Sequence, residues 1–296
     1  MDLVSNLSEK TNTVICFLLI NKIDAVPEIS IKSVLENTNS EVVIGYVNEN
    51  DIPVSLKNMR VKFLKIEVPE NIEKASSTLN SSYIDFSQNQ FFQIVQLKWV
   101  LISELLRSSY KYIIYSDVDV VWINNPIPGL EAFFDKNSNI DIQIQSFTHA
   151  PEKVRLCMGF IAIRNCKNVT DFISICRKKH SEMLISNPKI GDDDVITELN
   201  SIEDYSKFIR ELPQSTFPVG NMLNLYSKRN LFPGLNSPEP YIFHANFVVG
   251  INEKLKLLQV LSKSRLNKKV RIPSNLINSI ELKLREIKFR IIRLTR

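Results

Sequence analysis

The first half of the chain alternates short apolar runs with longer stretches in which apolar residues recur every three or four positions. Runs rich in β-branched and aromatic residues predict strands. The predicted strands are Val14–Ile20, Val42–Val47, Val61–Ile66, Tyr112–Tyr115 and Ile140–Phe147. Helical spacing predicts helices over Ile29–Glu36 and from about Phe91 to Arg107. Because strands that alternate with helices are typical of βαβ units, we predict an α/β fold with a mainly parallel, Rossmann-like sheet flanked by helices.

The pattern continues past this region without a break. Phe160–Ile163 is strand-like and Val169–Leu184 is helical, and no linker rich in Gly, Ser or Pro separates a second domain. We therefore expect one domain over residues 1–254, followed by a basic helical extension over residues 255–296.

Composition narrows the class of protein. Of the 296 residues, 44% are hydrophobic and 23% charged, which excludes a disordered, collagen-like or coiled-coil chain. No apolar run reaches the roughly 18 to 20 residues that a membrane span needs. The first residues lack the basic and apolar regions of a secretory signal. We therefore expect a cytoplasmic protein.

Charge divides the chain unevenly. From Lys254 onward there are 13 basic and 2 acidic residues, whereas the residues before it hold 24 basic and 30 acidic ones. Within this basic end, Ser274–Arg296 places its apolar residues on one face of a helix. Such a helix either lies on an anionic membrane surface or docks on the body with a solvated basic face, and the sequence leaves both interpretations open.

Two aspartates directly follow the strand predicted at Tyr112–Tyr115. Asp117 and Asp119 fall at its carboxyl end, where ligands bind in open α/β sheets. Side chains two residues apart in extended chain point the same way, so the two carboxylates can hold one hard cation together. A lone Asp-x-Asp is a weak signal, and Asp192 with Asp194 supplies a second one. Solvation, a turn cap and metal binding are all compatible with the pair.

Lys98 interrupts the apolar stripe of the helix predicted from Phe91 to Arg107. It lies four residues after Ile94 and four before Ile102, both on that stripe. A lysine in such a place either extends its ammonium to water or meets an anion. Because this helix immediately precedes the strand that carries the aspartates, the ammonium could also reach a phosphate or sugar group bound at the edge of the sheet.

His244 lies in an apolar, strand-like run. Asn246 follows two positions later, Gly250 six and Lys254 ten positions later. A single histidine is more often a satisfied core residue than a ligand. In this combination, however, the imidazole can bind a metal, the glycine lets backbone approach a diphosphate, and the lysine supplies positive charge.

Three acidic residues, Asp192 to Asp194, open a predicted helix. Their negative charge suits the amino terminus of a helix, and that interpretation needs no substrate. The functional alternative is that they bind sugar hydroxyls through hydrogen bonds.

Taken in order, these segments resemble the nucleotide-diphospho-sugar transferase family, which includes plant xylosyl- and arabinosyltransferases and, more distantly, glycogenin. The resemblance covers about residues 83–254. It rests on YIDFSQNQF followed by Lys98, SDVDVVW with Asn124 to Pro126, CMGFIAIRN at 157–165, DDDVIT at 192–197 and the HAN…G…K pattern at 244–254.

The resemblance implies a GT-A fold and a glycosyltransferase activity, that of a hexosyl- or pentosyltransferase. It implies Mn²⁺ or Mg²⁺ as the metal and a nucleotide sugar, commonly a UDP-sugar, as the donor. The sugar would pass to a hydroxyl group of a glycan, glycolipid or protein acceptor, with retention of anomeric configuration.

Residue roles also follow from the resemblance. The implied metal ligands are Asp117, Asp119 and His244. The residues implied to bind the donor are Asp117, Lys98, Asp192, Asn246, Gly250 and Lys254, with Gly250 and Lys254 at the diphosphate and Lys98 and Asp192 at the sugar. The implied catalytic residues are Asp193, Asp192 and Lys98.

This chain departs from the family pattern in two places. Relatives usually read Asp-Gln where it has Asp192 and Asp193, so a carboxylate replaces a neutral amide. Asp193 could then stabilise an oxocarbenium-like state or form a covalent glycosyl-enzyme, and same-face attack with the leaving phosphate as base is the alternative. Cys157 and Met158 stand where many relatives carry Asn and a small residue, which alters a contact on the sugar or acceptor side.

Two other functions compete with this interpretation. A sugar-nucleotide nucleotidyltransferase would have a glycine-rich loop after the first strand, but this chain has no glycine before Gly45. A non-catalytic binding module tethered to a membrane by the basic extension is the other alternative. We expect no specific binding of nucleic acid.

Overall fold

The computed structural model describes residues 11–20, 25–68, 89–148, 154–220, 240–246, 248 and 250–264. These residues form two compact units, each assembled from segments that are far apart in the sequence. The first unit contains residues 11–20, 39–68, 89–118, 126–148 and 154–212. The second contains residues 25–38, 119–125, 213–220, 240–246, 248 and 250–264. None of the helices in the described ranges is long and apolar enough to cross a membrane.

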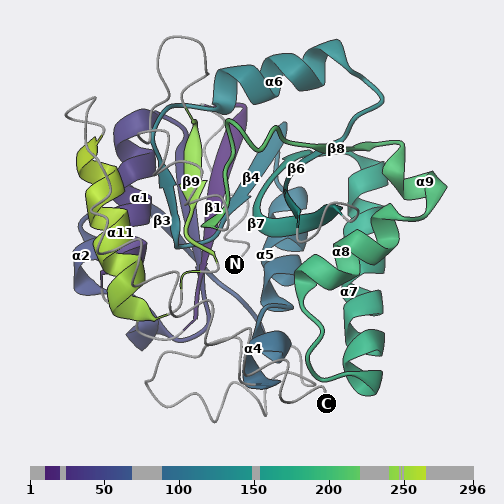
Figure 1. Ribbon diagram of the computed structural model, residues 1–296, viewed down its shortest axis with the longest axis horizontal. Coiled ribbons are helices and arrows are strands. Elements are labelled where there is room, and N and C mark those ends of the chain that lie inside the picture. Colours follow the sequence, from purple (N-terminus) through teal and green to yellow (C-terminus); the bar gives the residue numbers. More distant parts are fainter. Residues whose placement is uncertain are drawn as a thin grey trace. The chain divides into compact units, whose positions relative to one another are not determined.

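A seven-stranded sheet forms the centre of the first unit (Figure 1). In spatial order its strands are β3 (Lys62–Lys65), β2 (Glu41–Tyr46), β1 (Thr13–Leu19), β4 (Tyr112–Ser116), β7 (Val154–Arg164), β6 (Ile142–Thr148) and β8 (Ile209–Glu211). The pairs β3-β2, β2-β1, β1-β4 and β6-β8 are parallel, and β7 runs antiparallel to both β4 and β6. This arrangement confirms the predicted mainly parallel sheet.

The burial of β1 and β4 explains why the sequence shows these strands as continuous apolar runs. All seven residues of β1 are buried, as are all five of β4. Strands in parallel sheets are covered on both faces, so they show no alternation of apolar and polar residues. The predicted Tyr112–Tyr115 and Val14–Ile20 strands agree with β4 and β1 to within one residue at each end.

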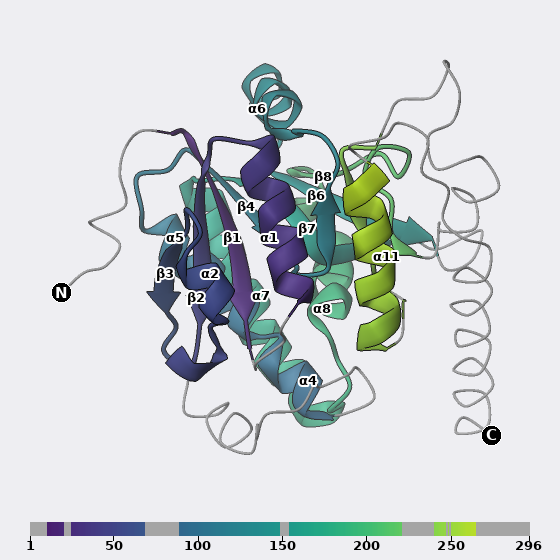
Figure 2. The same cartoon turned by 90° about the vertical axis from the view of Figure 1, so that its left-hand side faces the viewer.

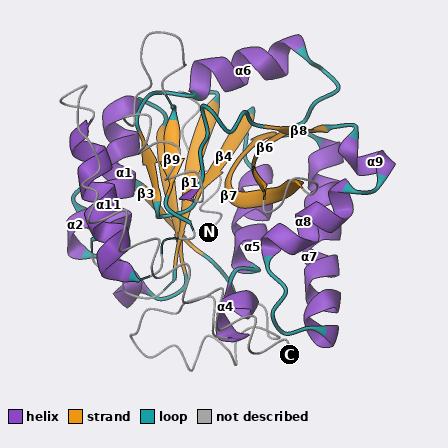
Figure 3. Cartoon of the chain, in the orientation of Figure 1, coloured by secondary structure: helices purple, strands orange, loops and turns teal. Residues whose placement is uncertain are grey.

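Helices cover this sheet and complete the core of the first unit (Figure 3). Its helices are η2 (Glu49–Asp51), α2 (Val54–Lys57), α4 (Asn89–Ile94), α5 (Leu97–Leu106), α6 (Ile127–Lys136), α7 (Lys167–Ser186), α8 (Asp192–Asn200) and α9 (Glu203–Ser206). One buried apolar cluster joins α5, α7 and α8 to strands β1, β4, β6 and β7. The helix expected at the three acidic residues is confirmed, because α8 begins at Asp192.

The helix predicted from Phe91 to Arg107 is in fact two helices. α4 ends at Ile94 and α5 begins at Leu97. The backbone N–H groups of Lys98 and Trp99 donate to carbonyls three residues earlier, which tightens the chain between the helices. The Gln96 side chain donates to the carbonyl of Gln93 at 3.1 Å, and this local bond competes with a regular helix.

The second unit is a small sheet with two helices. Strands β5 (Val120–Trp122) and β9 (Ile242–His244) pair antiparallel, with Val120 opposite His244. Helices α1 (Val26–Asn37) and α11 (Ile251–Ser264) lie side by side against it (Figure 2). The Ser30 hydroxyl donates to the carbonyl of Val120 at 2.5 Å, and the N–H of Trp122 donates to the Ser33 hydroxyl at 2.9 Å. These bonds fix β5 on α1.

The predicted basic extension remains a prediction. Helix α11 spans the boundary between residues 254 and 255, where the extension was expected to begin. Residues 265–296, including the predicted amphipathic segment Ser274–Arg296, lie outside the described residues.

Candidate functional site

In the first unit, an ion cluster forms at the carboxyl end of β4. Asp117 directly follows this strand, and its backbone N–H donates to the carbonyl of Gly159 on β7 at 2.8 Å. The Lys98 ammonium lies 3.0 Å from Oδ1 of Asp117 and 2.8 Å from Oδ2 of Asp192. Lys98 on α5 therefore contacts two carboxylates from different parts of the chain. Of the two alternatives for this lysine, extension into water and an anionic partner, the structure shows the second.

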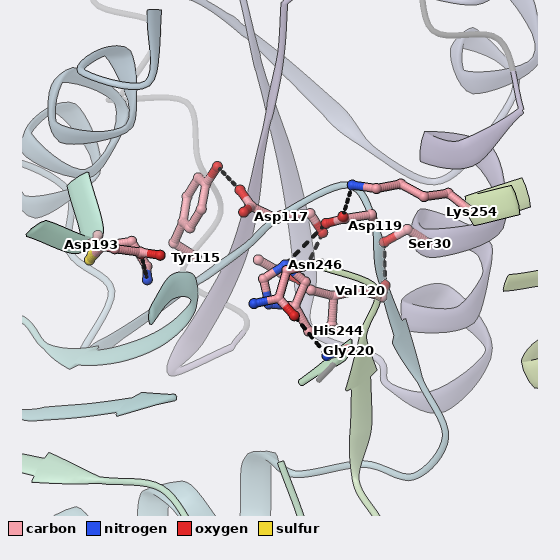
Figure 4. A network of polar contacts seen from close by, with 12 residues as sticks. Ser30, Tyr115, Asp117, Asp119, Val120, Asp193, Gly220, His244, Asn246 and Lys254 are labelled. Atoms are coloured by element: carbon pink, nitrogen blue, oxygen red, sulfur yellow. Dashed lines mark hydrogen bonds and ion pairs between the residues drawn. The ribbon is translucent and has the colours of Figure 1, made fainter. Parts of the chain in front are cut away.

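Tyr115 completes this cluster from within β4. Its hydroxyl donates to Oδ1 of Asp117 at 2.7 Å (Figure 4). The Lys98 ammonium also lies 5.4 Å from the centre of the Tyr115 ring, within range of a cation–π contact. Burial and then the charge of Asp117 raise the pKa of Tyr115, so its hydroxyl stays protonated and remains a donor.

The electrostatics of Lys98 depend on its two partners. The residue is 8% exposed, and burial alone would lower its pKa. The carboxylates of Asp117 and Asp192 outweigh that effect and raise the pKa of Lys98 well above its ordinary value. The ammonium therefore stays charged and holds two negative side chains at one point of the sheet edge.

Asp193 has a different environment from its neighbour Asp192. Its Oδ1 accepts a hydrogen bond of 2.6 Å from the backbone N–H of Met158 on β7. Burial and then the negative charge of Asp192 raise the pKa of Asp193 to about 7, although Lys98 and the Met158 bond act in the opposite direction. A carboxyl group with such a pKa changes its protonation state near neutral pH.

Asp193 is expected to make stability fall as pH rises. The group binds its proton more tightly in the folded chain than in the unfolded chain, where an aspartate has a pKa of roughly 3.9. The contribution of Asp193 to the free energy of unfolding is fully present below about pH 3.9 and is lost as pH rises through about 7. Asp193→Asn keeps an acceptor for the Met158 N–H but cannot ionise. We expect thermal unfolding to show a higher Tm than wild type at pH 8, with the difference shrinking as pH falls toward 5.

Asp135 on α6 provides a control of opposite sign. Hydrogen bonds from Tyr112 and Lys111 lower the pKa of Asp135. Asp135→Asn should therefore lose stability relative to wild type at pH 8 and recover it toward acid pH. A Tm difference for Asp193→Asn that stays constant across the pH range would contradict the raised pKa.

In the second unit, Asp119 lies between two basic side chains (Figure 4). Nε2 of His244 lies 3.2 Å from Oδ1 of Asp119, and the Lys254 ammonium lies 2.5 Å from Oδ2. The N–H of Ala245 donates to the backbone carbonyl of Asp119 at 3.0 Å, so the pairing of β5 with β9 also fixes the residue's position. Burial alone would raise the pKa of Asp119, but Lys254 and His244 hold it far below the ordinary range.

Asn246, two residues after β9, has a hydrogen-bond partner in a distant segment. The backbone N–H of Gly220 donates to Oδ1 of Asn246 at 2.7 Å (Figure 4). A Cβ atom at Gly220 would lie 1.7 Å from the carbonyl oxygen of Asn246, so only glycine fits there. Gly250 has a φ of 94°, in the region that favours glycine, and α11 begins at the next residue.

The structure thus groups the predicted site residues into two sets. In the first unit Lys98, Asp117 and Asp192 form one ion cluster, and Asp193 neighbours it on α8. In the second unit Asp119, His244 and Lys254 form another, with Asn246 and Gly250 in the chain between the last two. Only Val118 separates Asp117 from Asp119, so their Cα atoms are at most about 7 Å apart by chain geometry.

Three supporting contacts were not predicted from the sequence. Tyr115 lies on β4 two positions before Asp117, which directly follows the strand, and this period of two could have revealed it. The Met158 N–H and Gly220 are backbone contributions from segments distant in sequence, and no sequence signal points to them.

Comparison with known proteins gives a family match. The model of the family described as nucleotide-diphospho-sugar transferase matches residues 56–258. Two Arabidopsis thaliana proteins, UDP-D-xylose:L-fucose alpha-1,3-D-xylosyltransferases 1 and 3, are each 24% identical to this chain, over 190 and 198 residues. Those regions cover 59% and 60% of this chain and 50% and 48% of the relatives, so the chain spans about half of their length.

Solved structures of glycosyltransferases share the fold. Mouse xyloside xylosyltransferase 1 is 13% identical, with a TM-score of 0.51 over 79% of this chain and 97% of that protein. The galactosyltransferase LgtC, solved with donor and acceptor sugar analogues, is 13% identical, with a TM-score of 0.53 over 90% of this chain and 99% of that one. These likenesses confirm the predicted GT-A type of fold.

Proposed function

Because the chain belongs to the nucleotide-diphospho-sugar transferase family, we propose that it is a glycosyltransferase that moves a sugar from a UDP-sugar to a hydroxyl acceptor. The proposed reaction depends on Mn²⁺, which Mg²⁺ could replace, and retains the anomeric configuration. The observation that carries the proposal is the position of Asp119. It lies against His244 and Lys254, and one residue separates it from Asp117 at the end of β4.

The donor set suits a hard divalent cation. Asp117 and Asp119 offer carboxylate oxygens, which suit Mn²⁺, and His244 offers Nε2, a common metal ligand. We assign the cation to these three residues. When bound, it would neutralise part of the negative charge that develops on the departing nucleoside diphosphate.

The diphosphate itself is assigned to the start of α11. The positive φ of Gly250 turns the backbone into this helix, and the amino terminus of a helix attracts phosphate through its N–H groups and its dipole. Lys254 lies one turn into the helix and supplies a full positive charge near the same end. Asn246 supports this assignment through its own position, which is fixed by the hydrogen bond from Gly220.

The donor sugar is assigned to the ion cluster of the first unit. Lys98 and Asp192 together offer a donor and an acceptor of hydrogen bonds, which a sugar with several hydroxyl groups can use. Asp193 is the catalytic carboxylate of the proposal. Stabilising positive charge at the anomeric carbon and attacking it both require the ionised form, so turnover should rise with pH through the pKa of Asp193 at about 7.

A panel of UDP-, GDP- and CDP-sugars tests the proposed function. We expect one or more UDP-sugars to release UDP when Mn²⁺ is present, with the release lost on adding EDTA and restored by excess Mn²⁺. NMR of the transferred or hydrolysed sugar reports its initial anomeric configuration. Formation of UTP from a UDP-sugar and pyrophosphate would show nucleotidyl transfer instead, and an absence of turnover with every donor would contradict the proposal.

A further inference from the structure

His180 on α7 connects two segments that carry site residues. Its side chain is 0% exposed, and both ring nitrogens have partners. Nε1 of Trp99 donates to Nδ1 at 3.0 Å, and Nε2 lies 3.0 Å from the carbonyl oxygen of Ile190. An indole N–H can only donate, so Nδ1 accepts and the ring proton lies on Nε2, which donates to Ile190. The imidazole is therefore neutral, with a fixed tautomer.

The two partners of His180 are close in sequence to an ion pair of the site. Trp99 follows Lys98 on α5, and Ile190 lies two residues before Asp192, where α8 begins. The ion pair between Lys98 and Asp192, at 2.8 Å, is a second link between the same two segments. The chain segments that carry these two charges are thus joined twice, once through the charges and once through the imidazole.

The pKa of His180 is lowered overall, which favours this neutral state. Burial lowers its pKa, whereas the negative charges of Asp192 and Asp194 raise it. The hydrogen bond from Trp99 requires the neutral form of His180, since an imidazolium has no lone pair with which to accept the Trp99 N–H. A protonated ring would leave a buried donor facing another donor, which is costly inside a protein.

We infer that His180 is a positioning residue, whose imidazole holds α5 and the start of α8 at the separation that places Lys98 and Asp192 for the donor sugar. This inference rests on the proposed function for its effect on catalysis. An apolar side chain at position 180 would leave the Trp99 N–H and the Ile190 carbonyl buried without His180 as partner, so the start of α8 would shift to satisfy them. A shift of about 1 Å at a reacting group can lower a rate by about a hundredfold.

The test compares His180→Leu with His180→Gln. We expect His180→Leu to lower kcat for the UDP-sugar by about 10- to 100-fold. Its affinity for UDP with Mn²⁺ should stay within about twofold of wild type, because the residues assigned to the diphosphate and two of the three assigned to the cation, Asp119 and His244, belong to the other unit. Glutamine has an amide oxygen and an N–H that can replace the two ring nitrogens, so His180→Gln should recover most of kcat.

Phe134→Leu on α6 is the matched control. Phe134 is a buried residue of the same unit, and its ring stacks on Tyr112, away from the ion cluster. This variant should lose stability through a cavity but keep the kcat of folded enzyme. Loss of kcat and UDP affinity in parallel in His180→Leu, or an unchanged kcat, would overturn the inference.

A second measurement separates this inference from the proposed function. The stability coupling between Lys98→Met and Asp192→Asn, measured by a double-mutant cycle, reports how closely the two charges are held. We expect this coupling to fall by more than about half in the His180→Leu background and to be unchanged in the Phe134→Leu background. If wild type turns over no donor, the proposed function fails while this result still decides the role of His180. An unchanged coupling would refute that role.

Discussion

Replacing Asp119 by asparagine is expected to lower Mn²⁺-dependent turnover of a UDP-sugar by about a thousandfold. A bound divalent cation supplies several kcal/mol of charge stabilisation in such reactions, and each 1.36 kcal/mol corresponds to a factor of ten in rate. Asp119 is a proposed ligand of this cation, with His244 near one carboxylate oxygen and Lys254 near the other. An amide removes the negative charge without changing the size of the side chain. Initial rates measured over a range of Mn²⁺ concentrations check this expectation.

Two further variants separate loss of the cation from loss of the fold. Asp119→Glu keeps the charge but moves it by one methylene, so its rate should lie between those of wild type and Asp119→Asn. Asp135→Asn removes an exposed aspartate paired with Lys111 and should leave turnover unchanged. Binding of Mn²⁺, followed by its electron paramagnetic resonance signal, should weaken in Asp119→Asn. A variant that keeps both Mn²⁺ binding and turnover would remove Asp119 from the cation site.

The second large effect is expected from Lys98→Met. Removing the ammonium leaves the carboxylates of Asp117 and Asp192 at a largely buried place without the cation they share. Breaking a buried ion pair from one side costs about 3–5 kcal/mol of stability. Methionine has a similar length and apolar stem, so lost packing contributes little to the difference. Chemical denaturation at pH 8 measures the change in the free energy of unfolding.

The pH dependence of Lys98→Met tests its electrostatic origin. The Lys98 ammonium lowers the pKa of Asp193, although burial and Asp192 set the net direction upward. Without Lys98 that pKa should rise further, so the loss of stability should be larger at pH 8 than at pH 5. Adding Asp192→Asn removes one of the unpaired charges and should restore part of the stability. A loss that is equal at both pH values and unaffected by Asp192→Asn would indicate a packing defect instead.

Local patterns were sufficient to predict most of the sheet in the first unit. Continuous apolar runs identified β1, β2 and β4, because strands buried on both faces have few polar residues. The break between α4 and α5 could not be predicted from the same pattern. It depends on the Gln96 side chain, which bonds to Gln93 and accepts from Ser181 on α7. The three-residue strand β5 is too short to show any period.

The candidate site could be predicted in part. Asp117, Asp119 and His244 were chosen from their order and from the residues that surround them, and the structure places Asp119 and His244 in contact. The partners of Lys98 were not predictable, since Asp192 is far away in the sequence and reaches it only through the packing of α8. The pKa of Asp193 likewise depends on burial and on charges that only the folded chain brings near it.

The contact between Lys254 and Asp119 has a consequence for how the proposed cation and nucleotide would bind. An ammonium ion already sits on a carboxylate oxygen that the proposed cation would use. Binding of such a cation at Asp119 would replace one positive charge by another and displace the Lys254 ammonium, which would then need a new anion. The diphosphate of the proposed donor would be such an anion, so we expect the cation and the nucleotide each to favour binding of the other. We therefore expect the protein to bind the ion and the nucleotide together more tightly than it binds either one alone.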